Sequence, residues 1–137
     1  MSMPSLGALL HAFLADELPL QRGLRPTSIK ANRDALRLFL IFVAADVPCR
    51  LTQITLDALT LDRVLRFLQH LEDNRHNHRR TRNHRLIILH AFFEFLGRRV
   101  PECLAVAQQV AAIPSKRVPP PETRFLDPDQ MATLFHQ

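Results

Sequence analysis

The amino-acid sequence predicts an all-α fold, a compact bundle of four to five helices followed by an extended C-terminal linker. Apolar residues recur three and four positions apart in nearly every segment, which is the spacing of amphipathic helices. Glycine is scarce, at 3 of 137 residues, and the alternation of β-branched and polar residues that marks a strand is nearly absent. A chain of this length with 47% hydrophobic residues can bury one core, so we expect one domain with a tail.

The first two helices are predicted on either side of a break. Helical spacing predicts a first helix over residues 4–18, which Pro19 and the stretch Gly23–Pro26 should end. Thr27 or Ser28 then caps a second helix that reaches about residue 46, before a proline. The apolar face of the first helix is Leu6, Leu9, Leu10, Phe13, Leu14 and Leu18. The core face of the second is Ile29, Leu36, Phe39, Leu40 and Val43.

Three more helices follow a short turn at residues 55–59. Thr60 is the expected N-cap of a third helix that runs to about Asp73. A fourth helix is predicted over residues 78–96 and should stop at Gly97. Pro101 in a first-turn position predicts a fifth helix to about Ala112. The apolar stripe of the third helix is Leu61, Val64, Leu65, Leu68 and Leu71, and the apolar arc of the fourth is Leu86, Leu89, Phe92, Phe93 and Leu96.

The composition changes after Ile113. Residues 114–124, Pro-Ser-Lys-Arg-Val-Pro-Pro-Pro-Glu-Thr-Arg, are predicted to form a stiff, basic, extended linker. A new helical pattern begins at Phe125 and is cut short at the end of the sequence. We therefore expect a helical domain over residues 1–113, a linker over residues 114–124, and the start of a further domain over residues 125–137.

Several classes of protein are disfavoured by the composition. The two cysteines, Cys49 and Cys103, lack the spacing of a disulfide framework or zinc finger, which indicates free thiols in a reducing cytoplasm. No apolar run approaches the ~20 residues that span a membrane. No basic segment precedes the N-terminal apolar residues, as a signal peptide would require. No phosphate-binding glycine loop or catalytic constellation is recognisable, so we expect no cofactor.

The charge points to a polyanionic partner. Lys+Arg number 18 against 13 Asp+Glu, a net charge of +5, and only Lys30 and Lys116 are lysines. Arginine favours shaped contacts to phosphates and base edges, although a GC-rich genome produces the same bias. Residues 75–85 hold five arginines, three histidines and no carboxylate. Such a cluster beside a strongly apolar segment predicts nucleic-acid binding.

Arg82 and Arg85 fall on the same arc of the fourth helix as its apolar residues. A guanidinium cannot be buried unpaired at acceptable cost, so the start of this helix should project beyond the core. A projecting basic helix end could enter a major groove of DNA. The histidines of this cluster, His76, His78 and His84, lack a neighbouring carboxylate or cysteine, so a metal site is not expected there.

The second helix carries a basic stripe. Lys30, Arg33 and Arg37 lie within about 60° of one another on a helical wheel, and the helix N-terminus adds N–H groups that suit a phosphate. The alternative for Arg33 or Arg37 is an ion pair on a solvated face, with Asp34 or with a Glu or Asp elsewhere in the chain. The predicted DNA-binding residues, linker included, are Thr27, Ser28, Lys30, Arg33, Arg37, Arg79, Arg80, Thr81, Arg82, Asn83, Arg85, Lys116 and Arg117.

Three stretches resemble the tyrosine recombinase (phage integrase) family. Residues 25–42, Arg-Pro-Thr-Ser-Ile-Lys-Ala-Asn-Arg-Asp-Ala-Leu-Arg-Leu-Phe-Leu-Ile-Phe, resemble its T-x-x-x-Y-x-x-D-L-x-x-F helix. Residues 80–96, from Arg-Thr-Arg-Asn-His-Arg-Leu to Phe-Phe-Glu-Phe-Leu, resemble its R-x-x-L-x-x-L-R-x-F-(F/Y)-x-(F/Y)-L helix. The ending, Ile113-Pro-Ser-Lys followed by Phe125-Leu-Asp-Pro-Asp-Gln-Met, resembles the family's interdomain linker and the first helix of its catalytic domain. The sequence departs from the family at Asn32, where tyrosine is common.

The resemblance implies the N-terminal core-binding domain, a SAM-like bundle that closes on duplex DNA opposite a catalytic domain. It also implies contacts with other recombinase protomers on DNA, through the first and last helices of the bundle. The family's catalytic residues, with the nucleophilic tyrosine, would belong to the absent domain, and the sequence contains no tyrosine, so this chain alone should not be an enzyme. Two alternatives stay open: a helical module that binds an acidic protein partner, and a helix-turn-helix regulator, which the long helices disfavour.

Overall fold

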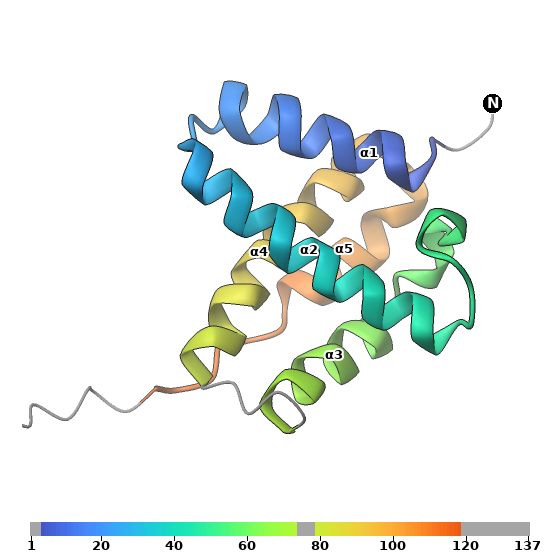
Figure 1. Ribbon diagram of the computed structural model, residues 1–137, viewed down its shortest axis with the longest axis vertical. Coiled ribbons are helices and arrows are strands. Elements are labelled where there is room, and N and C mark those ends of the chain that lie inside the picture. The colour runs from blue at the N-terminus through green and yellow to red at the C-terminus, as the bar shows by residue number, and fades with distance from the viewer. Residues whose placement is uncertain (1–3, 74–78, 119–137) are drawn as a thin grey trace, which may run out of the picture.

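The computed structural model describes residues 4–73 and 79–118, and in these residues the fold is helical, with no strand (Figure 1). The predicted all-α bundle is thereby confirmed. The helices are α1 (Leu6–Ala12), continued by a π-helix (Phe13–Gln21), then α2 (Pro26–Asp46), α3 (Leu61–Asp73), α4 (Arg79–Arg99) and α5 (Leu104–Ala111). Short 3₁₀ turns lie at Leu51–Gln53, Leu56–Ala58 and Pro101–Cys103.

Phenylalanine side chains join the helices at the centre of the bundle. Phe39, in the middle of α2, packs on Phe67 of α3 and Phe93 of α4, with ring centroids 5.3 and 6.2 Å apart. Phe13 packs edge-on against Phe92 at 5.3 Å and so holds the π-helix on α4. Edge-to-face pairs add about 0.5–1.5 kcal/mol each to the gain from burial. In Figure 1, α2 accordingly crosses in front of α4, with α1 across one end of the bundle.

The predicted apolar faces are nearly all buried. Every residue of the predicted arc of α4 is less than 2% exposed, and Leu36, Phe39, Leu40 and Val43 of α2 are buried. Of the other predicted residues, some are half-buried, namely Leu10, Leu14, Ile29 and Leu61. Leu65 is 45% exposed, and Phe67 takes the inward position instead. One residue turns a helix by about 100°, so Leu65 points away from the face that Val64 and Leu68 share with Phe67.

The sequence predicts that Pro19 ends the first helix, but in the structure it does not. The helix instead continues as a π-helix from Phe13 to Gln21. At its end, the Arg22 N–H donates to the Glu17 carbonyl at 3.0 Å. In an α-helix the ring of proline collides with the carbonyl four residues earlier, and the wider π turn relieves that collision. Gly23, at a φ of 64°, then turns the chain into α2.

Thr27 and Ser28 do not cap α2, which corrects a second boundary. The helix begins at Pro26, and Arg25 is the N-cap residue without a side-chain capping bond. A proline at the first helical position has no N–H to leave unsatisfied and already holds a helical φ. Thr60, by contrast, caps α3 as predicted, since its Oγ1 accepts a hydrogen bond from the Arg63 N–H at 3.2 Å.

Gly97 also fails to end its helix, since α4 continues to Arg99. The glycine meets α5, and a Cβ placed on it would lie 2.9 Å from the Cβ of Ala107. A glycine is required there because two helix backbones approach closely, which is a tertiary reason that the local sequence does not display. The prediction that the fourth helix stops at Gly97 is therefore wrong.

Both cysteines are free thiols. Cys103 is buried and Cys49 is half-buried, and burial raises the pKa of the Cys103 thiol. None of the helices in the described ranges is long and apolar enough to cross a membrane. The predicted start of the fourth helix at His78, the second part of the linker and the helical pattern from Phe125 lie outside the described residues.

Candidate nucleic-acid interface

The basic stripe of α2 is open to solvent. Lys30, Arg33 and Arg37 are exposed, and at this spacing they share one face of the helix. None of the three forms an ion pair with a carboxylate among residues 4–73 and 79–118, and this includes the carboxylate of Asp34. The alternative of a solvated pair with Asp34 is therefore not what the structure shows. These side chains are available to an outside anion.

The first turn of α2 adds polar groups beside this stripe. Thr27 is exposed and Ser28 is half-buried. Asn32, which stands where the family commonly has tyrosine, is half-buried, and its Nδ2 donates to the Ser28 carbonyl at 2.9 Å. The Asn32 side chain therefore bonds to the backbone of its own helix, one turn earlier.

The start of α4 divides into two kinds of residue. Arg79 and Arg80 are exposed, as predicted for a DNA-facing end, while Thr81 and Arg85 are half-buried. Arg82 is only 6% exposed, so the prediction that this end projects beyond the core is wrong for Arg82. We use the name open cations for Lys30, Arg33, Arg37, Arg79 and Arg80. They are the predicted DNA-binding cations of α2 and α4 that are exposed and pair with no carboxylate in the described parts of the chain.

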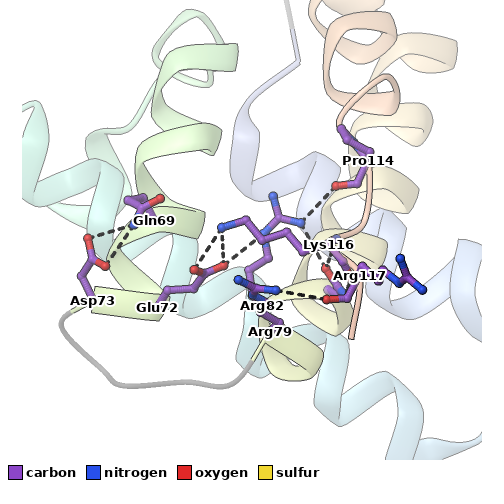
Figure 2. A network of polar contacts seen from close by, with 9 residues as sticks. Gln69, Glu72, Asp73, Arg79, Arg82, Pro114, Lys116 and Arg117 are labelled. Carbon is purple, nitrogen blue, oxygen red and sulfur yellow. Dashed lines mark hydrogen bonds and ion pairs between the residues drawn. The ribbon is translucent and has the colours of Figure 1, made fainter. Parts of the chain in front are cut away.

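Arg82 is tolerated inside because the chain beyond α5 returns to cover it (Figure 2). Its Nη1 donates to the Pro114 carbonyl and to Asn83 Oδ1, both at 3.1 Å. Its Nε lies 3.9 Å from Glu72 Oε1, at the end of α3. Burial lowers the pKa of Arg82, and the Glu72 charge opposes that shift. The guanidinium therefore has partners from two distant segments, which the local pattern could not reveal.

Asn83 holds the segment after α5 by both atoms of its amide. Its Oδ1 accepts from the Lys116 N–H at 2.8 Å, and its Nδ2 donates to the Lys116 carbonyl at 2.7 Å. The Lys116 ammonium reaches Glu72, with Nζ 2.8 Å from Oε1 and 3.0 Å from Oε2. Arg79 adds a longer contact from Nη1 to the Arg117 carbonyl at 3.4 Å. Three predicted DNA ligands, Arg82, Asn83 and Lys116, are thus engaged within the chain.

Sequence reasoning missed Glu72. It lies near the end of α3, 44 residues before Lys116, and no spacing rule links the two. Among residues 4–73 and 79–118, no three His, Cys, Asp or Glu residues gather as metal ligands would. His76 and His78, with Arg75, fall outside the described residues.

Carboxylates of the described residues also engage Arg22, Arg63, Arg66 and Arg98, and we call these the paired arginines. Arg63 and Arg66 both meet Asp46, at 2.9 and 2.8 Å, and join the start of α3 to the end of α2. Hydrogen bonds from Arg66, and secondly from Arg63, hold the pKa of Asp46 well below its ordinary range.

The remaining paired arginines surround a buried acid. Glu17 Oε2 accepts from Arg98 at 2.7 Å and from Arg22 at 3.1 Å, and Glu94 lies 3.2 Å from Arg22 and 3.6 Å from Arg98, which closes a ring of alternating charges. Burial alone would raise the pKa of Glu17, but the hydrogen bonds from Arg98 and Arg22 outweigh it and lower that pKa. None of these arginines belongs to the predicted DNA-binding set.

Comparison with known proteins places the bundle in a wider context. Residues 10–100 match the family described as "Phage integrase, N-terminal SAM-like domain". The chain is also similar to two proteins of Sinorhizobium fredii (strain NBRC 101917 / NGR234). "Putative integrase/recombinase y4rD" is 36% identical over 112 residues, which cover 82% of this chain and 40% of that protein. "Putative integrase/recombinase y4rC" is 32% identical over 131 residues, which cover 96% of this chain and 40% of that protein.

The chain therefore spans about two fifths of the length of these relatives. No solved structure matches it significantly.

Proposed function

Because this chain belongs to the phage integrase N-terminal SAM-like domain family, we propose that it is the DNA-binding domain of a site-specific tyrosine recombinase. In the whole protein it would grip duplex DNA opposite a catalytic domain. The open cations carry this proposal, since they offer anion-binding groups that no acid of the described chain neutralises. The sequence has no tyrosine, so the covalent step of such an enzyme would fall to another part of the protein.

The open cations suit a duplex in two respects. Arginine presents a planar fork of donors that fits two phosphate oxygens or the edge of a guanine. Lys30 and Arg33 lie in the first half of α2, Arg37 lies just past its middle, and Arg79 and Arg80 begin α4. Both helix starts lie toward the same side of the view in Figure 1. Exposed cations near two helix starts could contact neighbouring phosphates, and phosphate contacts would supply most of the affinity.

The proposed DNA contacts therefore form a subset of the predicted residues. They are Thr27, Ser28, Lys30, Arg33, Arg37, Arg79, Arg80, Thr81, Arg85 and Arg117. Within a longer recombinase, we expect residues 1–113 to act as the core-binding domain, residues 114–124 as the interdomain linker and residues 125–137 as the start of the catalytic domain. Contacts with other protomers on DNA also belong to this proposal.

A salt titration of DNA binding tests the proposal. With a fluorescent duplex of roughly 20–30 base pairs, four to six phosphate contacts should make log K fall with log salt at a slope of about −4 to −5. An acidic peptide with the same charge as the duplex is the control, because a module that binds an acidic protein partner would not prefer the duplex. Binding to the duplex no stronger than to the peptide would contradict the proposal.

A further inference from the structure

The segment after α5 runs back along the first turns of α4 (Figure 1), where its Arg117 carbonyl accepts from Arg79. It has no regular secondary structure between Pro114 and Val118. Its backbone groups nevertheless find partners on α4, namely Arg82 for the Pro114 carbonyl, Asn83 for both groups of Lys116, and Arg79 for the Arg117 carbonyl. An irregular segment with this many specific bonds is held in one place.

Asn83 makes the most informative of these contacts. One side-chain amide accepts from the N–H and donates to the C=O of the same residue, Lys116, at 2.8 and 2.7 Å. This pattern copies the way a neighbouring β-strand would bond that residue, and it depends on the peptide backbone. An amide that is saturated in this way has little left for a base edge or a phosphate.

Glu72 adds a charged hold on the same residue. The Lys116 ammonium lies 2.8 and 3.0 Å from the two Glu72 oxygens, and the Glu72 side chain is 19% exposed. The same carboxylate faces buried Arg82 at 3.9 Å. α3, α4 and the returning segment therefore share one polar cluster, visible in Figure 2.

We propose that Asn83, supported by Glu72, is a positioning residue that docks the backbone of the segment Pro114–Arg117 onto α4, and is not a DNA ligand. The dock fixes the point and the direction in which the chain leaves the bundle. The contact itself stands without DNA. Its role in setting a second domain relative to the DNA-facing end of α4 rests on the proposed function.

Amide hydrogen exchange, followed by NMR on the 137-residue chain, tests the dock. Asn83→Ala removes the acceptor of the Lys116 N–H, so exchange at that amide should accelerate at least about tenfold. Asn83→Asp keeps an acceptor and should retain most of the protection. His84→Ala changes the next residue, which is exposed, and should leave Lys116 unchanged. Exchange in the core of α4 reports on global stability and separates it from loss of the dock.

DNA binding of the same variants separates positioning from recognition. Asn83→Ala should keep its affinity for the duplex within about twofold, while Arg80→Ala should lower that affinity and flatten the salt slope by about one unit. Unchanged exchange at Lys116 in Asn83→Ala would overturn the dock. An affinity that falls in Asn83→Ala as far as in Arg80→Ala would overturn the assignment as a positioning residue. If Arg80→Ala bound DNA as tightly as the parent while Asn83→Ala behaved as expected, the result would contradict the proposed DNA interface. The dock would still stand.

Discussion

The open cations and the paired arginines are similar in chemistry and differ in their neighbours. Arg66 meets Asp46 and Asp62, both at 2.8 Å, while Arg33 and Arg37 have no carboxylate partner in the described chain even though Asp34 is close in sequence. A guanidinium that already shares its donors with an acid must break those bonds to hold a phosphate. Pairing therefore separates arginines that hold the fold together from arginines that can bind a ligand, and the count of arginines cannot.

Removing the three open cations of α2 should have the largest effect on binding. In Lys30→Ala/Arg33→Ala/Arg37→Ala, three lost phosphate contacts would lower DNA affinity on the order of 100-fold at about 0.15 M salt and flatten the slope by roughly 2–3 units. All three side chains are exposed, so thermal stability should barely change. Fluorescence anisotropy over a salt series measures the slope. An unchanged slope would remove α2 from the interface.

Arg82→Ala should instead act on stability, although the residue lies two positions from Arg80. The variant loses hydrogen bonds to the Pro114 carbonyl and Asn83, and leaves Glu72 with less compensation, which should cost about 1–3 kcal/mol of unfolding free energy. Urea denaturation measures this loss. The salt slope of DNA binding should stay within about half a unit of the parent value. A flattened slope at unchanged stability would return Arg82 to the predicted DNA-binding residues.

Glu17→Gln tests the other side of the comparison, with an expected cost of about 1–2 kcal/mol. The pKa of Glu17 in the folded chain lies below its ordinary value of 4.5. Its ionised form therefore stabilises the fold fully above about pH 4.5, and this contribution is lost as the pH falls through the folded pKa. Melting temperatures of parent and variant should differ at neutral pH and converge in acid. Glu94→Gln, at a more exposed acid of the same ring, is the matched control and should matter less.

Arg63→Gln/Arg66→Gln should give the smallest change in DNA binding. Both arginines meet Asp46 at the far end of α2, about 24 Å along the helix from Lys30 at 1.5 Å per residue. The salt slope should equal that of the parent, and the melting temperature should fall slightly. A slope as flat as that of the α2 triple variant would show that any arginine of this chain contributes equally to DNA binding. The distinction between paired arginines and open cations would then fail.

Much of the fold could be predicted because most of the helices follow one simple pattern. The arc of α4, the core face of α2 and the Thr60 cap all depend on neighbours within one or two turns, which a helical wheel represents. The predictions that Pro19 and Gly97 end their helices are wrong because each rests on the usual local effect of that residue type. The π turn at Pro19 and the contact of Gly97 with Ala107 depend on backbone geometry and tertiary packing.

The candidate site was predicted less completely for a related reason. The helical wheel places Arg82 on the apolar arc of α4, and the structure agrees, because Arg82 is buried there. The prediction that this helix start projects beyond the core is wrong for Arg82, because the partners of its guanidinium are distant in sequence. They are the Pro114 carbonyl, 32 residues later, and Glu72 on another helix. The exposure of Lys30, Arg33 and Arg37 agrees with the wheel, because it is a property of one helix. Their contact with DNA stays a prediction.

The closed ring of Glu17, Arg22, Glu94 and Arg98 has a consequence for how fast a partner arrives. Its charges cancel, and beyond a screening length of about 8 Å at physiological salt it adds little to the field around the protein. The net charge of +5 is then expressed by residues outside the ring, the open cations included. An approaching duplex would be attracted and turned by that field before contact, so the association rate should fall with salt more steeply than the dissociation rate rises.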